Sequence, residues 1–375
     1  MPKPRGGRSG CSPAALPFDP TVVAPRLLAW YGAYGRDLPW RQTRDPYRIW
    51  LSEIMLQQTT VAAVIPFYQS FLAAFPDVAL LAAAPSERVI ELWAGLGYYS
   101  RARNLHKAAR AVVEEFGGNF PANVEGLTAL PGIGRSTAGA IVSIAFDRPA
   151  PILDGNVRRV LVRLFALQGD PRGPAAERRL WEWAETLTSK ARPHDYAQAI
   201  MDLGATVCTP RNPECPVCPL NELCQARLHG LERQLPQAAT RKAVPARRQV
   251  AVFIEAGGRY LVRARPAEGF LGGLWEFPTV DLGRDESPLA AASRFVGESG
   301  LAGELFCMGR LKHAYSHFSL ELELVGVKVS AGERVAENDW SWQAPAQLAE
   351  LPLHGAHRKA LVKLAATLTA GGRDE

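Results

Sequence analysis

The chain has 375 residues, of which 47% are hydrophobic, and its formal net charge is +6 with a pI of about 9.1. This apolar content is enough for packed cores, and no window approaches the ~18 apolar residues needed to cross a bilayer, which excludes a membrane-spanning protein. The length favours two domains. The basic balance favours a polyanionic partner such as a nucleic acid, although many basic proteins bind none.

The first ten residues, MPKPRGGRSG, are basic and rich in proline and glycine, and no apolar stretch of signal-peptide length follows them. We expect residues 1–18 to form a disordered arm. Four of the six cysteines lie within residues 208–224. Such crowding in a protein without an export signal favours metal binding over disulfides. We therefore expect a cytoplasmic protein, located at the nucleoid if the source is bacterial.

Residues 19–207 show one helical pattern after another, without the alternation typical of strands, and predict an all-α domain that extends to residue 230. Asp45 is placed to cap a helix over residues 47–58, and Ser86 to cap one over residues 87–96. Further helices are expected over residues 99–116, 137–146, 156–167, 177–187 and 195–207.

The composition changes after the cysteine cluster. Residues 231–247 combine prolines, small residues and charge with little periodicity, which is typical of an interdomain linker. The hydrophobic period then becomes two, and it predicts a hairpin over residues 250–265 and strand structure over 313–329, with a helix over 288–296 between them. Residues 248–370 are therefore predicted to form an α+β domain.

The stretch LPGIGRSTAGAI, residues 130–141, is a predicted tight turn followed by the start of a helix. Gly132 and Gly134 leave the backbone uncovered and allow positive φ. The N–H groups at the start of the next helix, near Arg135 and Ser136, would suit an anion such as a nucleic-acid phosphate. Taken alone, the pattern fits an ordinary turn between two helices equally well.

The cysteine spacing is Cys208-x6-Cys215-x2-Cys218-x5-Cys224. Four thiolates in one short loop can hold a tetrahedral metal ion or a cubane cluster. Zinc sites usually pair cysteines as two CxxC arms, and this loop has one such arm, so the uneven gaps favour a [4Fe–4S] cluster. The spacing resembles that of the endonuclease III family of DNA glycosylases, where it holds such a cluster. A purely structural role for the cluster stays open.

With this loop in place, the glycine turn resembles the helix-hairpin-helix of the same superfamily, and the resemblance covers residues 20–228. WLSEIMLQQT at 50–59 and GLGYYSRARNLHKAA at 95–109 resemble the adenine DNA glycosylases of the MutY type. In PILDGNVRRV, Asp154 matches the catalytic aspartate of the superfamily. The resemblance implies excision of adenine mispaired with 8-oxoguanine or guanine in double-stranded DNA, as a step of base excision repair.

The resemblance assigns the chemistry to Glu53 and Asp154. Glu53 is the implied acid that protonates adenine at N7, and Asp154 faces the sugar, where it stabilises or traps the cation, supported by Asn156. The pair suits a reaction in which the leaving base needs a proton and an oxocarbenium-like sugar needs a negative charge. Burial would have to raise the pKa of Glu53. Each residue alone also fits an ordinary interpretation, a solvated glutamate and a helix N-cap.

The target base must leave the duplex before the pocket can hold it, and the resemblance makes Gln58 and Tyr98 the residues that fill or wedge the gap. In relatives that also cut the strand, the position of Ser136 holds a lysine that forms a Schiff base. No lysine occurs between Lys107 and Lys190, so we predict base removal without strand cleavage. Candidate phosphate contacts are Arg101, Arg103, Arg135, Arg158 and Arg159.

GGLWEFP, residues 272–278, resembles the start of a Nudix fold. Nudix hydrolases bind Mg²⁺ through three acids of a following helix. Here Glu298 is the one that remains and Arg294 replaces another. We therefore expect the fold without the hydrolase activity.

HAYSH, residues 313–317, resembles the loop with which MutY-type proteins sense 8-oxoguanine, with Tyr315 in place of a phenylalanine. Ser316 and His317 offer hydrogen-bond donors and acceptors to a purine edge. The alternative is a strand whose alternate residues face solvent.

Three other functions fit the sequence less well. A bifunctional glycosylase and abasic-site lyase of the endonuclease III type, acting on oxidised pyrimidines, is opposed by Ser136 and by the additional domain. A DNA-lesion binding protein without catalysis is opposed by Glu53 and Asp154. A nucleotide pyrophosphohydrolase is opposed by the incomplete acidic helix. We expect a monomer whose partner is DNA, without membrane association.

Overall fold

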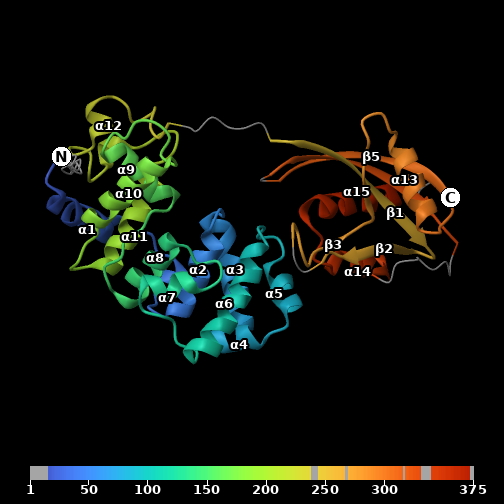
Figure 1. The fold of residues 1–375 in the computed structure, drawn as a ribbon, viewed down its shortest axis with the longest axis horizontal. Helices are drawn as coiled ribbons and strands as arrows, with labels where there is room; N and C mark the ends of the chain where they lie inside the picture. Colours follow the sequence, from blue (N-terminus) through green and yellow to red (C-terminus); the bar gives the residue numbers. More distant parts are fainter. Residues whose placement is uncertain (1–15, 238–243, 267–268, 316, 331–338, 372–375) are drawn as a thin grey trace, which may run out of the picture. The chain divides into compact units, whose positions relative to one another are not determined.

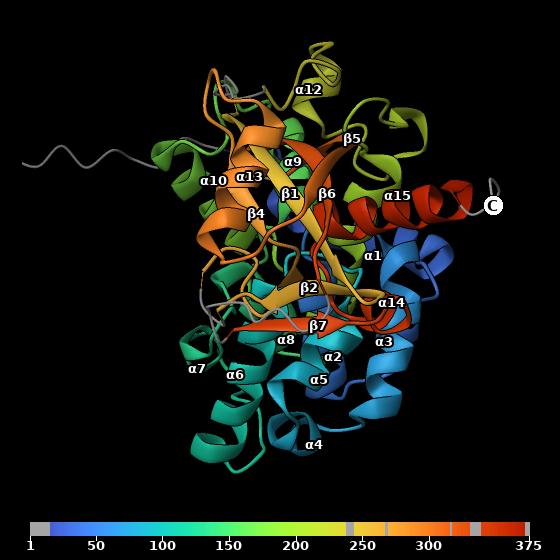
Figure 2. The ribbon, with the colours of Figure 1, turned by 90° about the vertical axis from the view of Figure 1, so that its right-hand side faces the viewer.

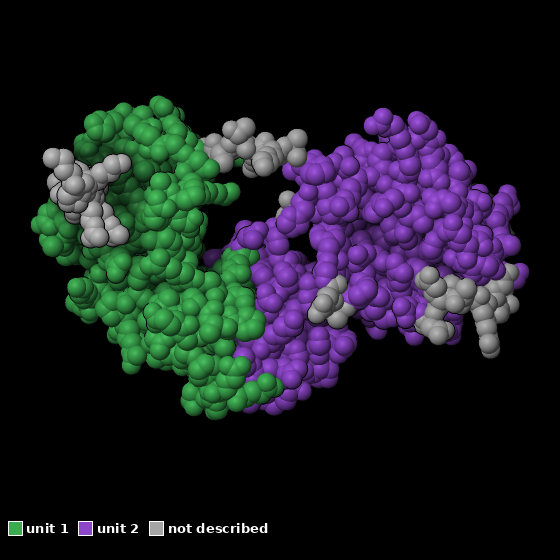
Figure 3. All heavy atoms as spheres, viewed as in Figure 1, with its two compact units in different colours: residues 1–57, 114–241 green, residues 58–113, 242–375 purple. Residues whose placement is uncertain are grey.

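The computed structural model describes residues 16–237, 244–266, 269–315, 317–330 and 339–371. It divides into two compact units, residues 1–57 with 114–241 and residues 58–113 with 242–375 (Figure 3). Most of the predicted N-terminal arm, part of the predicted linker, and Ser316 lie outside the described residues. In the described part of the chain, the helices are too short or too polar to cross a membrane.

The first unit is helical, as predicted (Figure 1). Its helices are α1 Val23–Tyr34, α2 Pro46–Leu56, α7 Val124–Ala129, α8 Arg135–Phe146, α9 Gly155–Leu164, α10 Pro174–Leu187, α11 Pro193–Asp202 and α12 Gln225–Leu228. Helix α2 packs against α8, and α1 and α8 both pack against α11. The buried side chains Trp50 and Phe120, with ring centroids 5.2 Å apart, belong to this core.

Three helices of this unit end earlier than predicted, and the first is α2, which ends at Leu56, two residues before the predicted end. Helix α9 ends at Leu164 because Ala166, two residues further on, has a φ of 50°, which a continuing α-helix cannot contain. Helix α11 ends at Asp202, and a π-helical turn, Leu203–Val207, leads from it to the first cysteine of the cluster.

The second unit contains the helices α3 Val61–Ala74, α4 Val78–Ala83, α5 Ser86–Trp93 and α6 Ser100–Phe116. Of the two predicted helix N-caps, Asp45 is confirmed and Ser86 is not. Asp45 caps α2 by accepting a hydrogen bond from Tyr47 N at 2.9 Å, as expected. Ser86 is not a cap, and this prediction was wrong: Pro85 holds the extended conformation of the N-cap position, so Ser86 is already the first helical residue.

The remainder of the second unit is a mixed sheet with helices, which confirms an α+β fold. The strands are β1 Ala246–Ala256, β2 Arg259–Ala264, β3 Trp275–Glu276, β4 Thr279–Asp281, β5 Glu304–Ala314, β6 Ser319–Lys328 and β7 Trp340–Gln343, and the helices are α13 Pro288–Glu298, α14 Pro345–Glu350 and α15 Gly355–Gly371. The main strand order is β3-β2-β1-β6-β5. Strand β1 is antiparallel to β2, as the predicted hairpin requires, and parallel to β6.

The two faces of this sheet follow from the alternation along β1. Val250, Val252 and Ile254 belong to the buried cluster that includes α13. Ala251 and Phe253 belong to the cluster that includes α15. Helices α13 and α15 therefore cover opposite faces of the sheet, and both lie beside β1 and β6 in Figure 2.

Candidate active site and iron–sulfur loop

The predicted glycine turn joins α7 to α8. Gly132 has a φ of 78°, a conformation that favours glycine. Gly134 is the N-cap of α8 and has no side chain to cap it, and a Cβ placed there would meet nothing within 4 Å. Open space thus lies next to the first turn of α8, where backbone N–H groups lack intrahelical partners. This is the arrangement that a phosphate site needs.

The same turn also fixes the segment that leads to Asp154. Ser136 Oγ accepts a hydrogen bond from Leu153 N at 3.0 Å. A Cβ on Gly139 would lie 2.2 Å from the carbonyl oxygen of Pro151, so α8 and this segment pack backbone to backbone. Neither contact was expected from the sequence. The small residues around Gly139 are the sequence feature that could have indicated this close backbone packing.

Glu53 projects from α2, a helix whose neighbouring side chains Trp50, Leu51 and Met55 are fully buried. Glu53 itself retains partial solvent access. Burial by the surrounding protein raises the pKa of its carboxyl to about 7, and the charge of Asp154 contributes in the same direction. The structure therefore places the two predicted carboxyls within electrostatic reach of each other in one unit.

Asp154 caps α9 and takes part in the same electrostatic pair. Its Oδ1 accepts a hydrogen bond from Val157 N at 2.7 Å, and its Oδ2 accepts one from the side-chain nitrogen Nδ2 of Asn156 at 3.4 Å. Burial raises the pKa of Asp154, while these hydrogen bonds and the charge of Arg159 oppose the rise. The capping interaction thus fixes the carboxylate in one orientation.

Arg41 is a charged neighbour of Glu53 that the sequence analysis missed. Its charge lowers the pKa of Glu53 and so opposes the effect of burial. Arg41 donates to Asp202 Oδ2 at 2.6 Å through one nitrogen, and Arg36 donates its backbone N–H to the same oxygen at 3.0 Å. Burial alone would raise the pKa of Asp202, but the hydrogen bonds from Arg41 and Arg36 lower it. The ionised Asp202 therefore offsets the charge of Arg41.

Asn156 connects the carboxyl pair to the cysteine loop. Its Oδ1 accepts from Arg159 at 2.8 Å, and Arg159 donates to the carbonyl oxygens of Cys208 and Gly204, each at 2.6 Å. A Cβ on Gly204 would lie 2.6 Å from Cβ of Asn156. Helix α9 and the π-helical turn thus approach as closely as a glycine allows, a constraint that no sequence pattern indicated.

The four predicted ligands, Cys208, Cys215, Cys218 and Cys224, line one pocket of about 300 Å³, counting the space at its mouth. Among the described residues, no three His, Cys, Asp or Glu side chains are gathered as they would be around a single metal ion. A cubane cluster is larger than one ion, so its thiolates lie further apart. The common pocket suits such a group.

The chemistry of the pocket also fits a cluster. Burial raises the pKa of the Cys218 thiol to about 12 and raises that of Cys224, so free thiolates would be unfavourable there without bound metal. The buried side chain of Arg163 lies 3.3 Å from Cys208 Sγ. Such a donor stabilises a ligating thiolate.

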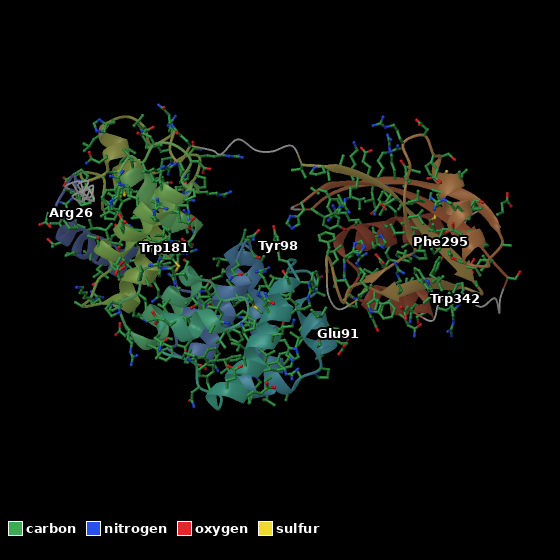
Figure 4. All side chains as sticks on the ribbon, in the orientation of Figure 1. Arg26, Glu91, Tyr98, Trp181, Phe295 and Trp342 are labelled. Carbon is green, nitrogen blue, oxygen red and sulfur yellow. The ribbon has the colours of Figure 1, made fainter. Side chains whose placement is uncertain are left out.

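The two predicted wedge residues, Gln58 and Tyr98, both have positive φ, 57° and 50°. This region is uncommon for residues with a side chain and often marks functional positions. Gln58 is exposed, and Tyr98 is 43% exposed (Figure 4). The guanidinium of Arg101 lies 5.5 Å from the centre of the Tyr98 ring. Both predicted residues thus present side chains to solvent on a constrained backbone.

Several candidate phosphate contacts have partners within the protein. Arg135 stacks over the ring of Trp181, the α10 residue labelled in Figure 4, at 4.0 Å. Arg158 donates to Glu177 at 3.2 Å, and Arg101 is buried. These three arginines therefore contribute to packing and hydrogen bonding within the protein.

In the C-terminal sheet, Tyr315 lies on a loop between β5 and β6, with its hydroxyl 3.0 Å from His354 Nδ1. His317 is exposed. On α13, Glu298 is exposed and Arg294 forms an ion pair with Glu286 at 3.1 Å. The cation predicted to replace a metal-binding acid is thus satisfied within the protein.

Comparisons with known proteins agree with both parts of the chain. Residues 51–186 match the HhH-GPD superfamily of base excision DNA repair proteins, and residues 249–363 match the NUDIX domain. Residues 208–224 match the iron–sulfur binding domain of endonuclease III, which confirms the predicted [4Fe–4S] cofactor.

Among curated proteins, an adenine DNA glycosylase of Homo sapiens is 38% identical over 366 residues, which are 82% of this chain and 67% of the relative. The chain belongs to the adenine DNA glycosylase family. An adenine DNA glycosylase of Buchnera aphidicola subsp. Schizaphis graminum is also 38% identical, over 69% of this chain and 75% of the relative's length. Family membership makes the protein an enzyme, a DNA glycosylase, and confirms the predicted combination of a helix-hairpin-helix glycosylase with a Nudix-like domain.

A solved structure of a thermostable thymine-DNA glycosylase is similar to the helical part. It is 32% identical with a TM-score of 0.51, covering 56% of this chain and 97% of that chain. The helix-hairpin-helix glycosylase fold is therefore shared beyond the adenine DNA glycosylases.

The raised pKa of Glu53 predicts a pH-dependent cost in stability. Below about pH 4.5 the carboxyl is neutral in folded and unfolded chains. Between about pH 4.5 and 7 the unfolded chain releases the proton while the folded chain keeps it, so the folded state loses stability across this window and regains none above it. Glu53→Gln should therefore gain stability over the native protein as pH rises, by up to about 3 kcal/mol at pH 8. Urea denaturation at pH 5 and pH 8 measures this. The exposed Glu185→Gln on α10 is the control, and equal behaviour of both variants would contradict the assignment.

The close approach of Gly204 to Asn156 predicts that Gly204→Ala disturbs the cysteine loop. The added methyl group must push α9 away from the turn that leads to Cys208, at a cost of about 1–3 kcal/mol. We expect a lower melting temperature and less iron per chain. Gly32→Ala on α1, where a Cβ meets nothing within 4 Å, is the matched control. Full iron content and unchanged melting of Gly204→Ala would show that the turn has room to spare.

Proposed function

We propose that this protein is a monofunctional DNA glycosylase that excises adenine mispaired with 8-oxoguanine, or with guanine, in base excision repair. The observation that carries the proposal is the carboxyl pair: Glu53 with a pKa of about 7, electrostatically coupled to Asp154. A buried acid that holds its proton near neutral pH is what an unactivated purine leaving group needs. Membership of the adenine DNA glycosylase family supports adenine as that base.

The proposed reaction begins when Glu53 donates its proton to N7 of the flipped adenine. Cleavage of the N-glycosidic bond leaves an oxocarbenium-like sugar, which the negative charge of Asp154 stabilises or traps. Asn156 and the N–H of Val157 hold Asp154 in place during this step. Water then completes the hydrolysis, with Glu53, now ionised, as the base. The iron–sulfur cluster, when bound, supplies structural support to the loop at the end of the α11 segment.

DNA is proposed to be held by the first turn of α8, with Gly132, Gly134, Arg135 and Ser136 near a backbone phosphate. Gln58 and Tyr98 occupy the gap that the flipped base leaves, for which their exposure suits them. In the Nudix-like domain, Tyr315 and His317, together with Ser316, contact the 8-oxoguanine on the opposite strand. We propose that the protein acts as a monomer, since each residue assigned above belongs to one chain.

The decisive experiment uses a duplex with 8-oxoguanine opposite adenine and a label on the adenine strand. Because Ser136 cannot form a Schiff base, and its hydroxyl oxygen is occupied by Leu153 N, we expect strand cleavage only after treatment with alkali. Glu53→Gln should abolish the product, and the native rate should fall as pH rises above about 7 because the acid is then ionised. Cleavage without alkali, with a protein–DNA adduct trapped by borohydride, would support instead the lyase acting on oxidised pyrimidines.

Asp154→Asn separates the two roles of this residue. Asparagine caps a helix as well as aspartate does, so α9 should remain intact and the melting temperature nearly unchanged. The charge that stabilises the sugar cation is lost, and we expect the excision rate to fall on the order of 10²-fold or more. Single-turnover excision and thermal melting measure the two effects. An active Asp154→Asn would mean that the residue serves only as a cap.

A further inference from the structure

Phe270 is an exposed aromatic residue to which the sequence analysis gave no role. It lies between β2 and β3 and is 42% exposed. It is not an isolated surface phenylalanine, because its ring centroid lies 5.2 Å from that of Tyr315, edge to face, and 5.3 Å from that of Phe318. His317 is 6.4 Å away. Phe270 therefore belongs to the aromatic group around the loop that the proposed function assigns to 8-oxoguanine.

The backbone at Phe270 is anchored to a buried charge. Arg265 donates through Nε to the carbonyl oxygen of Phe270 at 3.1 Å and through another nitrogen to Glu276 Oε2 at 2.5 Å. Glu276 is only 3% exposed, and Arg263 is its second ion-pair partner, at 3.1 Å. A buried carboxylate with two guanidinium partners is costly to disrupt, so it holds Phe270 in position through Arg265.

Tyr315 is anchored to the same carboxylate from the other side. Its hydroxyl lies 3.0 Å from His354 Nδ1, and His354 Nε2 lies 3.9 Å from Glu276 Oε2. Burial lowers the pKa of His354 to about 3, so its ring is neutral. The nearby Glu276 carboxylate favours the tautomer with its proton on Nε2, and this tautomer leaves Nδ1 to accept from the tyrosine hydroxyl. The phenylalanine expected from the family resemblance could not make this hydrogen bond.

These contacts form a closed path that runs from Glu276 through Arg265 to Phe270, across the ring contact to Tyr315, and back through His354. The path joins two loops that are far apart in the sequence, and it includes the two aromatic rings of Phe270 and Tyr315. Arg247, which is exposed, holds its guanidinium 4.5 Å from the centre of the Phe318 ring. The Phe318 ring is itself buried, but it contacts the exposed ring of Phe270. A cation next to an aromatic group with one exposed ring suits a nucleotide, whose base stacks while its phosphate meets the charge.

We propose that Phe270 is a second base-contacting residue, which forms with Tyr315 a fixed aromatic pair for the 8-oxoguanine opposite the excised adenine, and that Glu276 and His354 are positioning residues for the pair. The identity of this base rests on the proposed function. The ring-to-ring contact makes the two aromatic residues act as one surface, so the loss of either should disable both.

The test is a double-mutant cycle on the full-length protein with its iron–sulfur cluster. Affinity is measured by fluorescence anisotropy for a duplex with 8-oxoguanine opposite a non-hydrolysable adenosine analogue, and for the same duplex with guanine in place of 8-oxoguanine. Phe270→Ala should raise Kd for the 8-oxoguanine duplex about tenfold, the range typical of one lost aromatic–base contact. The Kd for the guanine duplex divided by the Kd for the 8-oxoguanine duplex, which measures the preference for 8-oxoguanine, should therefore fall.

The double variant Phe270→Ala/Tyr315→Ala should lose no more affinity than the weaker-binding single variant, because the pair acts as a unit. Tyr315→Phe removes only the anchoring hydroxyl. It should lower the preference for 8-oxoguanine, the Kd for the guanine duplex divided by that for the 8-oxoguanine duplex, without a change in iron content. Phe306→Ala is the matched control, since Phe306 on β5 is 44% exposed and lies outside the aromatic group.

Unchanged affinity of Phe270→Ala, additive losses in the double variant, or an equal loss in Phe306→Ala would each overturn the inference. Where Phe270→Ala melts much below the native protein, Phe270→Leu keeps the apolar bulk without the flat ring, and full affinity of that variant would equally overturn it. Adenine excision by the native protein is scored separately. Its absence would refute the proposed function, whereas normal excision with unchanged Phe270→Ala binding would refute only the aromatic pair.

Discussion

The largely desolvated surroundings of the Glu53 carboxyl, which raise its pKa to about 7, are the physical constraint on which the candidate site depends. A glutamate in water is ionised at neutral pH, and only a protein environment that opposes ionisation lets it keep a proton for the leaving base. That environment requires α2 to be held rigidly, and the fully buried Trp50 and Met55 on the same helix hold it. It also requires the nearby Arg41 to be compensated, which the carboxylate of Asp202 does.

Much of the candidate site could be predicted from short motifs, because each carries its chemistry locally. Cysteine spacing is one case, and Asp154 next to a helix start is another. The sequence left two interpretations of Asp154 open as alternatives, a cap or a charge near the sugar. The structure shows that capping leaves its other oxygen for Asn156, so both interpretations are compatible. The contacts of Ser136 with Leu153 N and of Gly204 with Asn156 could not be predicted, since they join segments distant in sequence.

The fold shows the same division between local and distant information. The hairpin of β1 and β2 follows from alternation around a glycine turn, but alternation does not say that β6 lies parallel to β1 on its other side. Strand β5 escaped prediction because a register shift between Cys307 and Gly309 interrupts the period of two, and because most of the strand is exposed. The end of α11 at a π-helical turn likewise has no distinct sequence signal.

The arginines show why net charge predicts a class of partner better than it predicts contacts. The composition indicated a polyanion, and the family agrees. Yet Arg163 is almost fully buried and donates to backbone carbonyls and to a cysteine sulfur, and Arg159 donates to the carbonyl oxygens beside the same loop. Arg135 holds its guanidinium over an indole ring. A guanidinium used in this way still contributes to the positive field that attracts DNA, because the field depends on charge and not on a free hydrogen bond. The same side chains can therefore hold the cysteine loop and the α8 turn in shape while they favour the approach of a duplex.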